Sequence, residues 1–282
     1  MDRAGVGVRC RGAVSRCGGQ RQVASPAVLG AIVGGVVGLI LAPFVSLLSA
    51  RPPLREGAEP LSLAMRCDSC RAPVALKDAV PLVSFALLRG RCRACAGRIA
   101  RTDFLAEVAS VVVASLIGWR VGLHAAVWAH LLLGAVLVVV VIVDFRLHKI
   151  PTRLVYPATA ASVALLALAS AHDGSWAAFR RAVLGALAAS AFLWLLVLVA
   201  PSGMGDGDAR LALLLGLFLG WQGWKHVYFG LLAGFLVGSL AGIGLMIARR
   251  GGRKMQIAFG PYLAVGALWV VLWPGVVSRV TG

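Results

Sequence analysis

Charged residues, and acidic ones above all, are scarce in this 282-residue chain. Aspartate and glutamate together number 11, and charged residues make up 14% of the sequence against 60% hydrophobic residues. Soluble domains carry about 25% charged residues, so the composition argues against a water-soluble protein. The chain also lacks the alternation of polar and apolar residues that marks the strands of a transmembrane barrel. No internal repeat is visible, which disfavours transporters built from inverted repeats.

What the sequence does contain is a series of uncharged runs of about 20 residues, the length with which a helix crosses a bilayer. Such runs occupy 27–50, 121–143, 154–171, 182–205, 226–248 and 255–278, and weaker candidates lie at 104–123 and 209–224. The sequence therefore predicts an all-α, polytopic integral membrane protein with about eight transmembrane helices. Residues 1–25 form a basic leader that we expect to be disordered. The run after it is too long for the apolar core of a cleaved signal peptide, so we interpret 26–50 as the first transmembrane helix.

Glycine recurs inside the predicted spans. Gly230, Gly234, Gly238 and Gly242 fall at every fourth residue and therefore lie along one face of a helix. Small residues on one face allow helices to approach closely in lipid, so this face predicts a tight helix contact.

Positive charge is abundant, with a formal net charge of +17, and it is unevenly distributed. In an eight-span arrangement the loop 51–103 and the three loops near 144–153, 206–210 and 249–254 share one side, and they hold 18 of the 28 Lys and Arg residues. Basic loops face the cytoplasm. We therefore expect these loops in the cytoplasm, a lipid bilayer as the partner of the basic residues, and no nucleic acid. The five arginines of the leader fall on the other side, so either the large loop orients the first span or the native start lies downstream. The oligomeric state does not follow from the sequence.

Two CxxC pairs, Cys67/Cys70 and Cys92/Cys95, lie in the loop 51–103 and are separated by 21 residues. Two such turns complete a tetrahedral site of four thiolates for zinc. Disulfides are the alternative, but they rarely persist in a reducing compartment. Four thiolates leave no open coordination position, so the predicted zinc is structural. The leader cysteines Cys10 and Cys17 have no comparable pattern.

Only four acidic residues follow residue 108: Asp144, Asp173, Asp206 and Asp208. Asp173 lies in a polar loop and is expected to be solvated. Asp144 closes an apolar run, where an ionisable side chain is costly and its default interpretation is functional. Asp206 and Asp208 lie in "PSGMGDGDAR", between two apolar runs.

In the eight-span arrangement Asp144 and the 206/208 pair reach the same membrane boundary. Two carboxylates in a poorly solvated site share a proton, so one can act as general base on a water and the other as general acid towards a carbonyl. This chemistry is peptide hydrolysis by an aspartyl dyad. Glycines at 203, 205 and 207 would let an extended substrate approach. The alternatives are a transporter whose aspartates relay protons, a helix N-cap role for Asp206, and a plain boundary charge for Asp144 paired with Arg146 or Lys149.

Four stretches resemble the bacterial type IV prepilin peptidases, a family of GxGD aspartyl proteases. "GMGDGDARL" resembles the family's G-M-G-x-G-D-x-K-L signature, and "VDFRLHKIP" resembles its other aspartate motif. "RCDSCRAPVALKDAVPLVSFALLRGRCRACAGRIARTDFLAEVAS" matches the family's cytoplasmic loop, and "FGPYLAVG" resembles its last-span signature. The matches follow the family's order over roughly residues 30–266.

The resemblance implies an eight-span protein of the bacterial inner membrane with its active site facing the cytoplasm. Such enzymes remove the basic leader of type IV prepilins or of secretion pseudopilins after a glycine, and many then methylate the new N-terminus with S-adenosylmethionine. Residue by residue, the resemblance makes Asp144 and Asp208 the dyad, places Asp206 at the variable position, and makes Cys67, Cys70, Cys92 and Cys95 the zinc ligands. It implies that 104–282 is a seven-helix aspartyl peptidase domain.

The chain departs from the family where the first span ends. Here the sequence reads "APFVSLLSARPP", with Ser46 in place of an Asn and Pro43 in place of a small polar residue. The N-terminal portion is associated with methyl transfer, so the resemblance supports the peptidase more strongly than the methyltransferase. Arg210 replaces the usual Lys and keeps its charge. A peptidase of the same class with a substrate other than a pilin is a further alternative.

Overall fold

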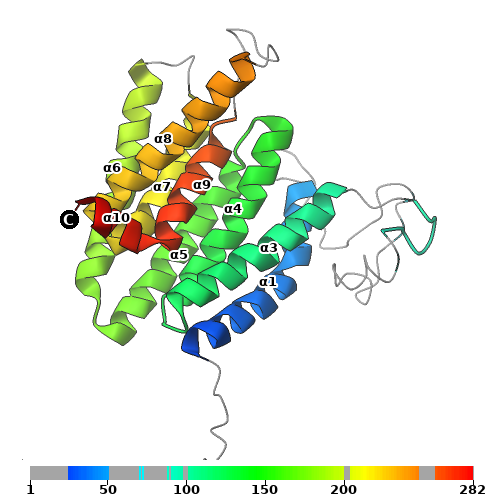
Figure 1. Cartoon of the computed structure of the whole chain (residues 1–282), viewed down its shortest axis with the longest axis horizontal. Coiled ribbons are helices and arrows are strands. Elements are labelled where there is room, and N and C mark those ends of the chain that lie inside the picture. Colours follow the sequence, from blue (N-terminus) through cyan, green and yellow to red (C-terminus); the bar gives the residue numbers. More distant parts are fainter. Residues whose placement is uncertain are drawn as a thin grey trace, which may run out of the picture.

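The computed structural model describes residues 25–50, 70, 72, 88, 90–97, 101–199, 204–247 and 258–281. In these residues the regular structure is entirely helical (Figure 1). The helices are α1 (Pro26–Ala50), α3 (Arg101–Val121), α4 (Val127–Leu147), α5 (Thr152–Asp173), α6 (Trp176–Val199), α7 (Asp206–Gln222), α8 (Trp224–Ile247), α9 (Gly260–Leu272) and α10 (Pro274–Thr281). The predicted all-α class is confirmed.

Six of these helices are long and apolar enough to cross a membrane: α1, α3, α4, α5, α6 and α8. Their outward faces carry large exposed apolar side chains such as Ile40, Leu168 and Leu240, as expected of surfaces that face lipid. The chain is therefore a polytopic membrane protein. The predicted run 255–278 is not one continuous helix, because α9 ends at Leu272 and α10 begins at Pro274. Proline lacks a backbone N–H and favours the first position of a new helix.

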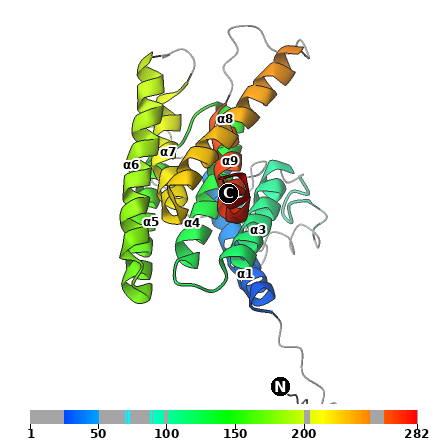
Figure 2. The ribbon, with the colours of Figure 1, turned by 60° about the vertical axis from the view of Figure 1, so that its left-hand side comes forward.

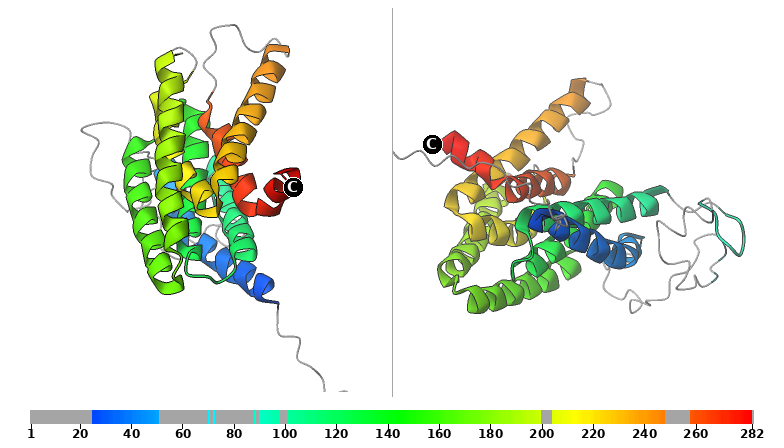
Figure 3. Two further views of the ribbon diagram at one scale, coloured as in Figure 1. Left: turned by 90° about the vertical axis from the view of Figure 1, so that its left-hand side faces the viewer. Right: turned by 60° about the horizontal axis from the view of Figure 1, so that its bottom comes forward.

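α4 and α7 form the centre of the bundle. In α4, 72% of the spanning segment is buried, compared with 28% in α1, α3 and α6. The residues of α7 from Leu214 to Gly220 are all buried. α5 and α9 each pack against both central helices, and Figure 2 shows α1 and α6 on opposite sides of the molecule. α8 leans away from the bundle towards its C-terminal end (Figure 3).

Glycine seams join neighbouring helices. Gly30 and Gly34 of α1 face Gly118 and Ala114 of α3 so closely that neither glycine could carry a Cβ. The predicted glycine face of α8 is confirmed for three of its four members. Gly230 packs on Leu219 of α7, Gly234 on Leu263 of α9, and Gly238 on Phe259.

The helices alternate in direction. The C-terminal ends of α1, α4, α6 and α8 and the N-terminal ends of α3, α5, α7 and α9 lie towards one end of the bundle, which is uppermost in Figure 1. We call this the upper end. The two sequence motifs that contain aspartates, at the end of α4 and the start of α7, therefore lie at the same end, as the eight-span arrangement predicts.

Candidate active site

Asp144 occupies the last turn of α4 and is buried, with 3% of its surface exposed. α4 ends where His148 adopts a left-handed conformation (φ +52°) and donates its N–H to the carbonyl of Asp144 at 2.8 Å. This conformation is uncommon outside glycine, and histidine is among the residues that tolerate it. It turns the chain sharply, so that Ile150 follows the helix end directly and Pro151 begins the approach to α5.

Asp208 occupies the first turn of α7 and is also buried, with 6% exposed. Gly205 is the N-cap residue in an extended conformation, and its carbonyl accepts a hydrogen bond from the Asp208 N–H at 3.1 Å. The alternative N-cap role for Asp206 is therefore wrong, because Gly205 holds that position and Asp206 is the first helical residue. The Asp206 side chain is 60% exposed and forms an ion pair with Arg210 at 2.7 Å.

The two aspartates of the motif also differ in their electrostatic surroundings. Asp208 precedes the apolar run of α7 and lies outside the six helices long enough to cross a membrane. Burial, and then the nearby negative charges of Asp144 and Asp206, raise the pKa of Asp208 to about 7, while a hydrogen bond from the backbone of Gly205 opposes the shift. The end of α4, which carries Asp144, and the start of α7, which carries Asp208, lie at the same end of the bundle (Figure 1). One oxygen of Asp144, Oδ2, is buried and has no hydrogen-bond partner among the residues that the structure describes.

Two further residues, Gly260 and Ile150, belong to this site. Gly260 is the first residue of α9, and a Cβ there would lie 2.6 Å from Oδ2 of Asp144 and 3.1 Å from Cδ1 of Ile150. A Cβ on Gly207 would lie 3.0 Å from Cβ of Ile150. Ile150 thus lies between Gly207, the chain neighbour of Asp208, and Gly260, whose backbone lies beside the Asp144 carboxylate. Both residues belong to quoted motifs, "HKIP" and "FGPY", but nothing in the sequence alone assigned them a role.

The glycines of the motif differ in their surroundings. Among the described residues, a Cβ on Gly205 would come no closer than 3.7 Å to the Asp208 carboxylate and would meet little else, so this position is open on that side. Gly207 packs on Ile150, as described above. Gly203 lies outside the described residues.

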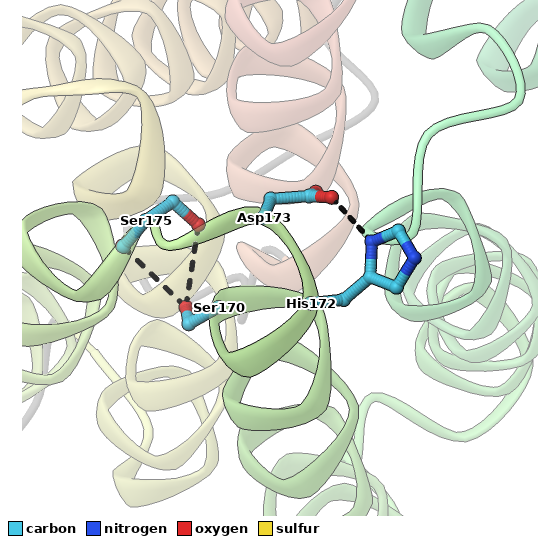
Figure 4. A network of polar contacts seen from close by, with 4 residues as sticks. All are labelled: Ser170, His172, Asp173 and Ser175. Atoms are coloured by element: carbon cyan, nitrogen blue, oxygen red, sulfur yellow. Dashed lines mark hydrogen bonds and ion pairs between the residues drawn. The ribbon is translucent and has the colours of Figure 1, made fainter.

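Asp173 is the last residue of α5 and lies at the end of the bundle opposite the end of α4 and the start of α7 (Figures 1 and 4). Its Oδ1 lies 2.6 Å from Nδ1 of His172, whose side chain is 79% exposed. Nearby, the hydroxyl of Ser175 donates a hydrogen bond to the hydroxyl of Ser170 at 3.5 Å (Figure 4). The prediction that Asp173 is solvated is confirmed, because the residue is exposed. Its predicted position in a loop is wrong, because Asp173 is the last residue of α5.

Three of the four predicted zinc ligands are described, and the structure brings them together. The sulfur atoms of Cys70, Cys92 and Cys95 all lie within 4.8 Å of one another. Tetrahedral zinc with Zn–S bonds of about 2.3 Å separates its sulfurs by about 3.8 Å, so the cluster fits a zinc ion. Cys67 lies outside the described residues.

The turn that carries Cys92 and Cys95 is closed by two backbone hydrogen bonds. The N–H of Cys92 donates to the carbonyl of Gly97 at 2.8 Å, and the N–H of Ala96 donates to the carbonyl of Cys92 at 2.9 Å. Ala96 has a left-handed conformation (φ +56°). This turn lies away from α7 and α9 (Figure 1), so a metal held there would not touch the aspartates.

Fold and site together define a class: a multi-pass helical membrane protein with a buried pair of aspartates at one end of its bundle. Residues 36–121 match the Bacterial Peptidase A24 N-terminal domain, and residues 131–247 match the Type IV leader peptidase family. The second match contains both Asp144 and Asp208 and ends before α9. The chain belongs to the type IV leader peptidase family.

Several relatives carry the name prepilin leader peptidase/N-methyltransferase. One from Aeromonas hydrophila is 33% identical over 218 residues, which cover 76% of this chain and 72% of the relative. One from Pseudomonas putida is 29% identical over 263 residues (84% and 88%). One from Neisseria gonorrhoeae is 31% identical over 210 residues (73% and 69%). No solved structure matches the chain.

Proposed function

We propose that this protein is a prepilin peptidase, an aspartic endopeptidase that removes the basic leader of type IV prepilins or pseudopilins by cleavage after a glycine. The observation that carries the proposal is the pair Asp144 and Asp208. Both are buried, and they reach the same end of the bundle from its two central helices. Family membership and the names of the relatives support the same reaction.

In the proposed mechanism the two carboxylates share one proton, since two close buried carboxylates do not both ionise. The ionised carboxylate takes a proton from a water molecule, and the water oxygen bonds to the carbonyl carbon of the scissile peptide. The protonated carboxyl gives its proton to the carbonyl oxygen, which forms a tetrahedral gem-diol. Collapse of this intermediate breaks the C–N bond: the protonated carboxyl gives its proton to the departing amine, and the ionised carboxylate takes a proton from one hydroxyl of the gem-diol. The products are a carboxyl group and an amine, and the dyad again holds one shared proton.

The upper end provides access for an extended substrate. Gly205 has no side chain beside the Asp208 carboxylate, and few atoms of the described residues surround the space that a Cβ would occupy. Arg146, Lys149, Arg153 and Arg210 lie in the helix ends and turns of the same end. By the positive-inside rule we place this end in the cytoplasm, with the protein in the bacterial inner membrane.

Zinc is proposed as a structural cofactor. Cys70, Cys92 and Cys95 would hold it, with Cys67 as the fourth ligand. An ion bound by four thiolates has no position for substrate, so its contribution is to fix the fold of the loop 51–103.

Methylation of the new N-terminus, with S-adenosylmethionine as the donor, is the proposed second activity. It rests on the names of the relatives. Since Ser46 and Pro43 depart from the family in the portion associated with methyl transfer, we expect methylation to be weaker than cleavage.

The test is mass spectrometry of a type IV prepilin co-expressed with the protein. We expect a product that lacks the leader and begins directly after a glycine, and an intact precursor when Asp144→Ala is used. The same spectrum shows methylation as an added mass on the N-terminal residue. An uncut precursor with folded wild-type protein contradicts the proposal. Proton-coupled uptake in vesicles without cleavage would instead identify a transporter.

A further inference from the structure

Ile150 has a special place beside the candidate dyad. Its side chain packs against the backbone of Gly207, the neighbour of Asp208, and against the backbone of Gly260, which itself touches the Asp144 carboxylate. Three segments of the chain therefore meet at Ile150: the end of α4, the start of α7 and the start of α9. The side chain is partly buried and packs on the main core of the bundle.

The backbone around Ile150 leaves it little freedom to move. On one side the left-handed His148 ends α4, with its N–H bonded to the carbonyl of Asp144. On the other side Pro151 fixes the chain, and its carbonyl accepts hydrogen bonds from Leu154 (2.9 Å) and Val155 (3.1 Å). The β-branched side chain of isoleucine also has few rotamers. Ile150 is thus a rigid apolar wall beside the carboxylates.

We propose that Ile150 determines specificity, by closing the space that a side chain on the acyl-side residue of the scissile bond would occupy, so that this residue must be glycine. The inference rests on the proposed function. In the reaction the scissile carbonyl carbon lies within reach of both carboxylates. The Cα of the acyl-side residue is bonded to that carbon, so its side chain must enter the space next to the pair. Gly207 and Gly260 contribute no side chain to that space, and the side chain of Ile150 occupies it.

Replacement of Ile150 by a smaller residue should allow substrates with an acyl-side residue other than glycine. We expect Ile150→Ala to raise the ratio of kcat/KM for a substrate with alanine at the acyl-side position to kcat/KM for the glycine substrate by about tenfold or more, the effect of one or two methylene groups in a pocket. Ile150→Val should give a smaller rise in the same ratio. Ile150→Leu, which keeps the volume, should retain the ratio of the wild-type enzyme.

A matched control is Ile142→Ala. Ile142 lies on α4 close to Asp144 in sequence, but it packs on a different cluster, with Val45 and Ala106. Loosening of α4 by that substitution should leave the ratio of the two substrates unchanged. The assay uses the full chain in detergent or lipid and two prepilins that differ only at the acyl-side residue.

The outcomes separate the inference from the proposed function. If wild-type protein fails to cut the glycine substrate, the proposed function is wrong. If it cuts that substrate but neither Ile150→Ala nor Ile150→Val changes the ratio, or both substrates slow in parallel, Ile150 only supports the structure and the inference is overturned. A change of the ratio in Ile142→Ala equal to that in Ile150→Ala overturns it as well.

Discussion

Gly260 lies directly against one carboxylate of the candidate dyad. Its Cβ, if present, would lie 2.6 Å from Oδ2 of Asp144, so the carboxylate must move in Gly260→Ala. A displacement of about 1 Å can cost about a hundredfold in rate. We expect kcat to fall by about that factor with little change in KM, measured on a purified prepilin.

The control for that substitution is Gly275→Ala, because a Cβ on Gly275 meets nothing within 4 Å. It should leave both kcat and KM as they are in the wild-type enzyme. Full activity of Gly260→Ala would show that Gly260 does not position Asp144.

The sequence predicted the buried aspartates more successfully than their surroundings. The apolar run before Asp144 and the Gly-Asp motif indicated both residues, and the structure buries both at the same end. Ile150 and Gly260 escaped prediction because their roles depend on where the start of α9 meets the end of α4, a contact between segments far apart in the chain. Asp206 was assigned an N-cap role as an alternative, and the extended backbone of Gly205 took that position instead.

At the scale of helices, the seam between α8 and α9 sets the position of Gly260. Gly266 of α9 lies against the backbone of Gly234 of α8, closer than any Cβ could be accommodated. Because backbone cannot rotate away, we expect Gly266→Ala to destabilise the protein by about 1–3 kcal/mol, the usual cost of overpacking. Unfolding of the purified protein by heat or denaturant would measure the change.

Two other glycines of α8 provide control substitutions for Gly266→Ala. The three atoms nearest to a Cβ on Gly230 all belong to the side chain of Leu219, which can change rotamer, so Gly230→Ala should be less destabilising. Gly244 has open space around it, and Gly244→Ala should have no cost from packing. Equal stability of Gly266→Ala and Gly244→Ala would contradict the importance of the α8–α9 seam.

Helix positions followed closely from hydrophobic runs, since a helix in lipid must be both long and apolar. The weak candidate 104–123, with charges in it, is nonetheless a full helix, α3, because its small residues pack on the glycines of α1. The last run was predicted as continuous, but it is divided before Pro274. Hydropathy does not register such a break, whereas the backbone chemistry of proline enforces it.

At the scale of the whole molecule, the cysteine cluster is a separate unit that can be tested by metal removal. Purified protein should contain about one zinc per chain, as expected of a single four-thiolate site, measured by elemental mass spectrometry. Cys92→Ser should lose it, because Cys92 supplies one of the three clustered sulfurs. A Cys10→Ser/Cys17→Ser double variant is the matched control and should keep its zinc. Wild-type protein that is metal-free, stable and active would contradict the zinc site.

The arrangement of the bundle explains why both aspartates belong to one site. Successive helices alternate in direction, so the end of α4 and the starts of α5, α7 and α9 lie towards the upper end. In the proposed topology a buried carboxylate pair at this end would lie at the membrane boundary, where water and a peptide chain can enter. Asp173, at the opposite end, is exposed and has no part in this site.

The central claim is that Asp208, and not its neighbour Asp206, forms the dyad with Asp144. The most direct measurement is the cleavage of a co-expressed prepilin by Asp206→Asn and Asp208→Asn, each compared at equal amounts of membrane-inserted protein. Asp208 is buried near Asp144, whereas Asp206 is exposed and paired with Arg210. The account predicts that Asp208→Asn leaves the precursor uncut and that Asp206→Asn retains substantial cleavage. An active Asp208→Asn together with an inactive Asp206→Asn would contradict it.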